Sequence, residues 1–292
     1  PTILEQIGTF FPDENIATNL SWNNNLEHLS LHFMVSLAKT LPKSYALYEI
    51  SKVKPEQMQN DEFQLLAYNL QSIAFQLNDW NYLGEYASGN ALDLINNEKI
   101  NYGVIPFNIG ISTSSLKEDE VKKIEWHGLS VLLKGLAEIN MEDENKKELG
   151  YENLGLFLED MEKIEVSNEI VDVIGILYYM KIGNKEKAIT HLSQLRSRDG
   201  VGNDEKELIK EIEQHLKQND FDKASAIVLK NSFVIKIILS YLSNKIEEQE
   251  WYQNSISSKT VNTFLKIPSL IEEEYNNVEK FSAEKMDSLK DL

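Results

Sequence analysis

Residues 170–198 read IVDVIGILYYMKIGNKEKAITHLSQLRSR, and this stretch contains the pattern that decides the fold class. The apolar run from Ile170 to Ile182 has the length of a buried helix. Gly183-Asn184 is a dipeptide typical of turns, and Glu186 to Arg198 follows as a second helical segment. The stretch therefore predicts two helices joined by a tight turn.

The same alternation of helical segments and short polar turns extends in both directions. Leu26, Leu29, Phe33 and Leu37, for example, lie three and four residues apart, which places them in one apolar stripe on a helix. No segment sustains the two-residue alternation of a half-buried strand. We therefore expect an all-α protein, in which further helices cover residues 26–39, 45–53, 63–77, 82–95, 116–139, 144–164, 205–217, 221–231 and 233–251.

The helical pattern is interrupted between Asn96 and Ser115. This stretch contains Gly103, Pro106 and Gly110 and has no helical periodicity, so it predicts a long ordered loop, a domain joint or a short strand. Its apolar residues should pack against the rest of the protein; they are Val104, Ile105, Phe107, Ile109 and Ile111. Ser115 and Glu118 have the spacing of a capping box for the next helix.

Three turns resemble those of tetratricopeptide repeats, helix-turn-helix units of about 34 residues. In the best match Tyr179, Gly183, Ala188 and Leu192 stand at the family's spacing. The same signature recurs 36 residues later, where Ala224 follows an Asn219-Asp220 turn. A third turn, Asn78-Asp79, is followed by Leu83 where the family has a small residue, so its two helices should pack less closely.

The resemblance implies an α-solenoid of antiparallel helix hairpins, in which a small side chain lets the second helix of each unit approach the first. Ala188 and Ala224 should therefore be buried at helix crossings. We divide the chain into N-terminal helical hairpins (residues 1–95), an irregular loop or joint (96–115), repeat-like hairpins (116–254) and C-terminal capping helices (255–292).

The resemblance also implies where a partner protein or peptide would bind. In the family the first helices of the units line a groove, and alignment on the turns carries the groove positions onto nine residues of this chain. They are Tyr68, Ser72, Gln76, Val173, Leu177, Lys181, Ile209, Glu213 and Lys217. Paired asparagines and basic residues of the family's carboxylate clamp are missing, so the resemblance does not imply recognition of an acidic chain terminus.

The composition restricts the classes of partner. The formal net charge is −18, which disfavours binding to nucleic acid or to anionic lipid surfaces. The sequence has no cysteine, so it forms neither disulfides nor thiolate metal sites. No apolar stretch is long enough for a membrane span. We expect a cytoplasmic protein, although a removed signal peptide would leave no trace in this sequence.

Few residues stand in a catalytic or metal-binding pattern. His28 and His32 have the four-residue spacing of a zinc-binding helix, but no glutamate follows His28 as the general base of that motif requires. We interpret them as two surface histidines and expect no metal site and no cofactor. The lone Gly200-Val201-Gly202 is an ordinary helix connector.

The sequence therefore favours a non-catalytic helical repeat protein that binds a protein or peptide. Two alternatives remain open. One is a helical enzyme or small-ligand-binding domain with its site near residues 96–115, because long irregular segments in compact helical proteins are often functional. The other is an acidic inhibitor or immunity-type protein that blocks a basic partner through charge complementarity.

Overall fold

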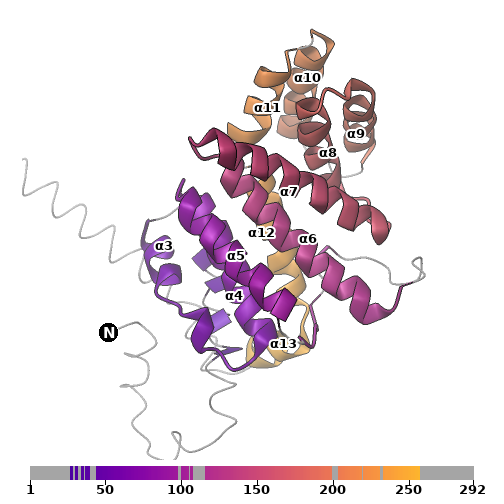
Figure 1. Ribbon diagram of the computed structural model, residues 1–292. Helices are drawn as coiled ribbons and strands as arrows, with labels where there is room; N and C mark the ends of the chain where they lie inside the picture. Colours follow the sequence, from indigo (N-terminus) through magenta and orange to yellow (C-terminus); the bar gives the residue numbers. More distant parts are fainter. Residues whose placement is uncertain are drawn as a thin grey trace, which may run out of the picture.

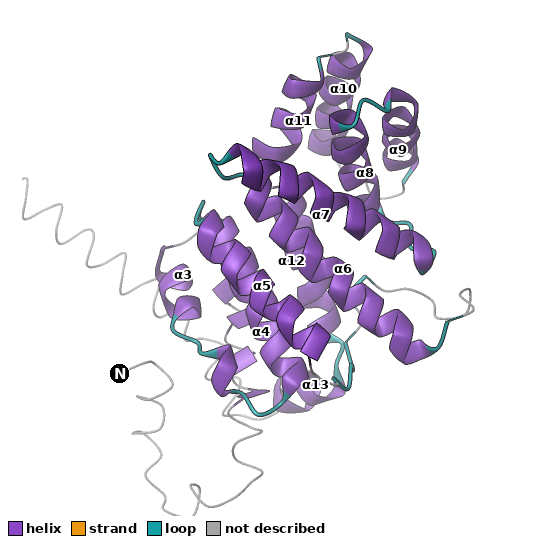
Figure 2. Ribbon diagram, in the orientation of Figure 1, coloured by secondary structure: helices purple, strands orange, loops and turns teal. Residues whose placement is uncertain are grey.

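The computed structural model describes residues 27–28, 30–31, 34–35, 37–39, 44–97, 100–104, 106–107, 116–198, 203–218, 220–230 and 233–256. Every regular element among them is a helix, so the predicted all-α class is confirmed (Figure 2). The named elements are α3 (Ser44–Ser51), the 3-10 turn η1 (Pro55–Gln57), α4 (Asp61–Gln76), α5 (Asn81–Asn97), α6 (Glu118–Ile139), α7 (Glu144–Lys163), α8 (Glu169–Lys181), α9 (Lys185–Ser197), α10 (Asn203–Lys217), α11 (Phe221–Lys230), α12 (Phe233–Glu247) and α13 (Glu250–Ile256).

Each helix from α4 to α11 packs against its neighbour in the chain, most extensively α6 against α7, α4 against α5 and α5 against α6 (Figure 1). Two of the turns contain a residue in the left-handed conformation, namely Asp79 (φ 61°) and Gly183 (φ 74°). Glycine and aspartate are among the residues that tolerate this conformation best, which is why these turns were visible in the sequence. Asn219, in the third predicted turn, lies outside the described residues.

Small residues set the distance between paired helices, as expected. Ala188 and Ala224 are fully buried, which confirms the prediction for both. In the α4–α5 pair, however, the close approach occurs at Gly84. Leu83 is 43% exposed, whereas a Cβ atom on Gly84 would lie 2.7 Å from Gln76 Cγ. Ser72 Oγ also donates a 2.8 Å hydrogen bond to the Gly84 carbonyl, so α4 and α5 pack closely after all.

Helices α6 and α7 form the most extensively packed pair of the described helices. Gly135 and Gly150 face each other across this pair, and a Cβ atom on either would lie 2.7–2.8 Å from the carbonyl oxygen of the other. The two backbones are therefore in direct contact. Trp126 and Phe157, one from each helix, are fully buried beside them.

Two predicted helix boundaries were wrong. Helix α6 begins at Glu118, and Glu120 Oε2 accepts a 3.0 Å hydrogen bond from the Lys117 amide, so Glu120 has the capping role assigned to Glu118. The predicted partner Ser115 lies outside the described residues. The expected single helix over residues 233–251 is divided, because α12 ends at Glu247 and α13 starts at Glu250.

Helix α12 does not continue the succession of pairs. It packs against α11 and also against α8 and α4, and in Figure 1 it runs behind α6 towards α4 and α13. Among the described helices none is both long and apolar enough to cross a membrane alone; residues 221–229 and 234–247 reach that length and composition only as a bent pair. The predicted capping helices after residue 256 lie outside the described residues.

Candidate binding groove

A groove of about 810 Å³ lies where α7, α8 and α9 meet. We call it the α7–α9 groove. Its lining residues are Gly155, Leu158, Glu159, Glu162, Glu165, Val166, Ser167, Val171, Asp172, Tyr178, Tyr179, Ile182, Asn184, Lys187, Thr190, His191 and Gln194. On α8, Val171 and Tyr178 lie seven residues apart, as do Asp172 and Tyr179, and residues at this spacing share one face of a helix.

The floor of the groove is aromatic because two glycines leave room for rings against helix backbones. A Cβ atom on Gly155 would lie 2.9 Å from the Tyr178 ring, and one on Gly175 would lie 2.5 Å from the His191 ring. Tyr179 then stacks on His191 with 5.5 Å between ring centroids and 15° between planes. Rings packed in this way have few alternative rotamers, so the floor is pre-organised.

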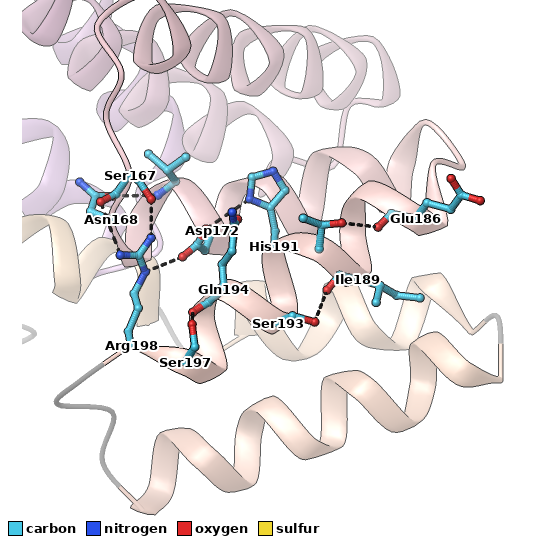
Figure 3. Close-up of polar contacts among 12 residues, drawn as sticks. Ser167, Asn168, Asp172, Glu186, Ile189, His191, Ser193, Gln194, Ser197 and Arg198 are labelled. Atoms are coloured by element: carbon cyan, nitrogen blue, oxygen red, sulfur yellow. Dashed lines mark hydrogen bonds and ion pairs between the residues drawn. The ribbon is translucent and has the colours of Figure 1, made fainter. Parts of the chain in front are cut away.

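An ionic network centred on the buried Asp172 holds His191 and Arg198 (Figure 3). Asp172 is only 1% exposed, and its two carboxylate oxygens lie 3.3 Å from His191 Nδ1 and 2.5 Å from Arg198 Nε. Arg198 also donates a 2.9 Å hydrogen bond from Nη2 to Ser167 Oγ. The network joins the first turn of α8 to the end of α9. Because the buried carboxylate has a permanent cationic partner, it does not require a ligand to balance its charge.

The Asp172–His191 pair resembles the orienting part of a hydrolytic triad, but the nearby hydroxyl groups are not placed as nucleophiles. Thr190 Oγ1 and Ser193 Oγ donate to carbonyl groups one turn earlier in α9, at 3.0 and 2.9 Å (Figure 3). Ser167 Oγ accepts from Arg198. A nucleophile needs a hydrogen bond to its base, and these three hydroxyl groups have other partners. None of these three hydroxyl groups is hydrogen-bonded to His191.

Apolar side chains stand at the exposed edge of the floor. Ile182 is 53% exposed, although it directly follows an otherwise buried apolar helix. Leu158 and Val166 line the groove from the α7 side and are partly buried. Lys187 lies above the Tyr179 ring, 4.8 Å from its centroid. An incoming chain would therefore find both apolar and aromatic contacts.

The rim on the α7 side is acidic and consists of Glu159, Glu162 and Glu165, all exposed. None of these three carboxylates forms an ion pair within the part of the chain that the structure describes. On the neighbouring face of α7, in contrast, Asp160 is paired with Lys163 at 3.0 Å and with His127 at 2.6 Å. The three rim carboxylates thus stand together at the groove without a cationic partner among the described residues.

Glu165 occupies an unusual backbone position. It has φ 56°, in the left-handed region, and forms the turn after α7. The Glu165 amide donates to the Glu162 carbonyl (3.1 Å) and the Val166 amide to the Met161 carbonyl (2.9 Å), which together make a Schellman motif. Glycine is the usual residue at this position, so a glutamate here raises the free energy of the folded state. Such strained residues are often found at functional sites.

The groove residues that the family resemblance placed on α8 lie on the opposite side of that helix. Each residue advances the helix by about 100°, so Leu177 points about 200° away from Gly175, at the centre of the groove face. Leu177 and Val173 are 0% and 3% exposed and belong to the core. Lys181 is exposed and lies 5.1 Å from the centroid of the Tyr151 ring.

The predicted residues of the first unit are largely used inside the protein. Ser72 is fully buried, and Gln76 Nε2 donates to Ser72 Oγ (3.0 Å) and to the Leu133 carbonyl (2.9 Å). Tyr68 is half-buried on the surface of the core. Helix α12 packs against α4 and α8, the helices that carry these residues and Leu177. Helix α12 therefore covers part of the expected groove along the first helices, and Gln76 lines a small cavity of about 150 Å³ together with Val228 and Val234.

The three predicted residues of the last unit are also separated from the α7–α9 groove. Ile209 is 3% exposed and belongs to the core. Glu213 is partly exposed and forms ion pairs with Arg196 and with Lys217, the latter at 2.8 Å. These pairs give the surface of α10 a local balance of charge.

The interpretation of His28 as a surface residue was wrong. Its ring stacks on Trp251, with 4.9 Å between centroids, and meets the edge of Phe63 at the same distance. Burial lowers the pKa of His28, while the nearby Glu27 opposes the shift. His32 lies outside the described residues. Among the residues that the structure describes, no three His, Cys, Asp or Glu side chains stand close enough to hold a metal ion.

The described part of the 96–115 segment is packed and hydrogen-bonded internally. Glu62 Oε1 accepts 2.6 Å hydrogen bonds from the amides of Gly103 and Val104, and Trp126 Nε1 donates to the Val104 carbonyl at 2.9 Å. Val104 and Phe107 are buried, as predicted. The described residues of this segment therefore serve the core, and we place the candidate site elsewhere.

Sequence reasoning missed the α7–α9 groove because its face of α8 is hidden in a helix that is apolar all round. Two signals were available. Tyr178-Tyr179 is an aromatic pair directly before an exposed turn, and Gly155 and Gly175 interrupt helices where alanine would be favoured. Comparisons with protein-family models, curated proteins and solved structures found no match for this chain.

Proposed function

We propose that this chain is a non-catalytic module that binds a segment of another protein in the α7–α9 groove, on an array of tetratricopeptide-like hairpins. The observation that carries the proposal is Ile182, which is 53% exposed at the edge of a rigid aromatic floor. Exposed aliphatic side chains beside fixed aromatic rings are typical of surfaces that anchor apolar side chains of a partner.

The shape of the groove supports a peptide rather than an enclosed small molecule. Its walls come from three helices, and lining residues on both sides, such as Glu162 and Gln194, are exposed to solvent. A helix or extended segment can enter such an open groove from the side and place apolar side chains on its floor. A small ligand would leave much of its own surface in water.

The two alternatives stand differently. One alternative is a helical enzyme or ligand-binding domain with a site near residues 96–115. The described residues of this segment, such as Val104, make buried contacts that support a structural role instead. An acidic inhibitor of a basic partner is compatible with the acidic rim of the groove, and it concerns the identity of the partner rather than the position of the site.

The proposal can be tested by site-specific photo-crosslinking in the native cell. A photoreactive amino acid is placed at Ile182 in the groove and, as a matched control, at Leu156, which is 46% exposed on α7 but does not line the groove. We expect one defined segment of a partner to crosslink at 182 and not at 156. A synthetic peptide of that segment should bind the wild-type protein and lose binding to the Ile182→Glu variant.

Two results would count against the proposal. One is the absence of any discrete segment that crosslinks at 182 more than at 156. The other is equal affinity of the captured segment for the wild-type protein and for Ile182→Glu, since an apolar anchor packed against the glutamate would remove water from its charge at a cost in free energy.

A further inference from the structure

We infer that the partner segment bound in the α7–α9 groove is basic, with arginine side chains that pair with the Glu159, Glu162 and Glu165 rim. This inference rests on the proposed function and specifies the chemistry of the occupant. It is carried by the charges and rings that line the groove.

The groove presents an uncompensated negative charge. Besides the three rim carboxylates, its lining contains Asp172, which is already neutralised by Arg198. The basic lining residues are Lys187 and His191. A partner that enters this groove with carboxylates would therefore meet repulsion, whereas arginine or lysine would gain attraction in a partly desolvated site.

The position of the rim carboxylates makes the absence of a cation costly for the free protein. Glu159 and Glu162 are three residues apart on one face of α7, and both belong to its last two turns, where the helix dipole is negative. Like charges at this spacing destabilise a helix. A cation bound between them removes that cost, so the free energy of binding includes the relief of this repulsion.

The floor can also accept a guanidinium group. Lys187 Nζ lies 4.8 Å from the centroid of the Tyr179 ring, which shows that a cation is accommodated over this aromatic pair. Arginine suits the site better than lysine because its planar group can stack on a ring and still donate two parallel hydrogen bonds to a carboxylate. The apolar edge at Ile182 and Leu158 then receives neighbouring apolar side chains.

The net charge of the whole chain favours the same class of partner. At −18 it attracts basic segments over long distances and repels nucleic acids and anionic membranes. The rim adds the local specificity that overall charge lacks, because its carboxylates stand beside the aromatic floor.

The inference can be tested without knowledge of the natural partner. A random dodecapeptide phage library is selected on the full-length wild-type protein, with counter-selection on the Ile182→Asn variant, which removes the apolar contact without changing the charge of the groove. We expect the enriched peptides to contain an excess of arginine next to apolar residues. Enrichment of neutral or acidic peptides would overturn the inference and leave the proposed function standing. A failure to enrich any peptide over the variant would overturn both.

The enriched peptides are then measured against two variants of equal charge. Glu162→Gln/Glu165→Gln alters the rim, and Glu148→Gln/Glu152→Gln alters two exposed glutamates of α7 outside the groove. Affinity should fall by about tenfold or more for the rim variant and stay within about twofold for the control. Equal losses in both variants would assign the effect to overall charge and would contradict the inference.

Discussion

The imidazole of His28 stacks on the indole of Trp251, with 4.9 Å between the ring centroids and 14° between the planes. The first described helical residues are thereby joined to α13, the last helix that the structure describes. Phe63 of α4 completes the cluster at 5.0 Å from Trp251. Residues that are far apart in the sequence thus depend on one another for burial.

Acidification should weaken this cluster. Burial lowers the pKa of His28 below its ordinary value of 6.5, so the folded state binds this proton less readily than the unfolded state. The contribution of His28 to stability is therefore complete above pH 6.5 and is lost as the pH falls through the folded pKa. Urea unfolding across this range should show a smaller pH dependence for His28→Phe than for the wild type. Identical pH dependence in the two proteins would contradict the assignment.

The Glu62 carboxylate should be essential for the ordered part of the 96–115 segment. It accepts hydrogen bonds from Gly103 and Val104, and the Val104 amide is buried. Glu62→Ala leaves that amide without an acceptor and should cost about 2 kcal/mol, whereas Glu62→Gln retains an oxygen acceptor and should cost less. Urea unfolding measures both free energies, and hydrogen exchange at Val104 should accelerate only in the alanine variant.

Glu62 should also contribute a pH dependence opposite in sign to that of His28. Burial raises its pKa above 4.5, so the folded state binds this proton more readily than the unfolded state. The stability that Glu62 contributes should rise as the pH falls through the folded pKa towards 4.5. The free-energy difference between the wild type and Glu62→Gln, measured at several pH values, should change accordingly. A difference that is constant with pH would show that burial does not act on this carboxyl.

Leu177 and Ile182 should respond very differently to the same substitution. Leu177→Glu places a charge in the core and should cost at least about 3 kcal/mol, because Leu177 has no solvent exposure. Ile182→Glu should change the free energy of unfolding by about 0.5 kcal/mol or less. Thermal and urea unfolding compare the two. A stable Leu177→Glu protein would restore the groove on that face of α8, which the family resemblance implied.

Glu165→Gly should stabilise the free protein. Glu165 adopts φ 56°, and glycine relieves the strain of a side chain in this region, with an expected gain of about 0.5–1 kcal/mol after the entropy of the unfolded chain is included. Gly183→Ala is the matched control, since Gly183 has φ 74° and a Cβ atom added there would meet nothing within 4 Å, and it should lose about 1 kcal/mol. A loss of stability in Glu165→Gly would contradict the strain argument.

The sequence allowed the prediction of the all-α class and of most helices and turns, but not of how the helices pack together. Turns such as Gly183-Asn184 are encoded locally, through the left-handed conformation that glycine accepts. The buried small residue Ala188 was also predictable, because it lies at a fixed spacing after the turn. Gly84 was missed because the spacing of the repeat family pointed to the position before it. The contact of Gly135 with Gly150 was missed because a glycine within a helix gives no sign of what approaches it.

The candidate groove was assigned to the wrong face of α8 because all faces of that helix are apolar. Local periodicity then cannot distinguish core from surface, and the choice depends on the helix that covers each side. Helices α11 and α12 both pack against α8, in addition to its neighbours α7 and α9. The burial of Leu177 thus depends on contacts that include segments distant in the sequence.

The path of α12 also has a consequence for synthesis on the ribosome. Helices α4 and α8 leave the exit tunnel long before α12, so the surfaces that α12 covers are exposed on the nascent chain until residues 233–247 have been translated. During that interval the protein displays apolar side chains to chaperones, and a chain truncated before α12 should be degraded or aggregate. The packing of α4 and α8 is therefore complete only after α12 has been synthesised.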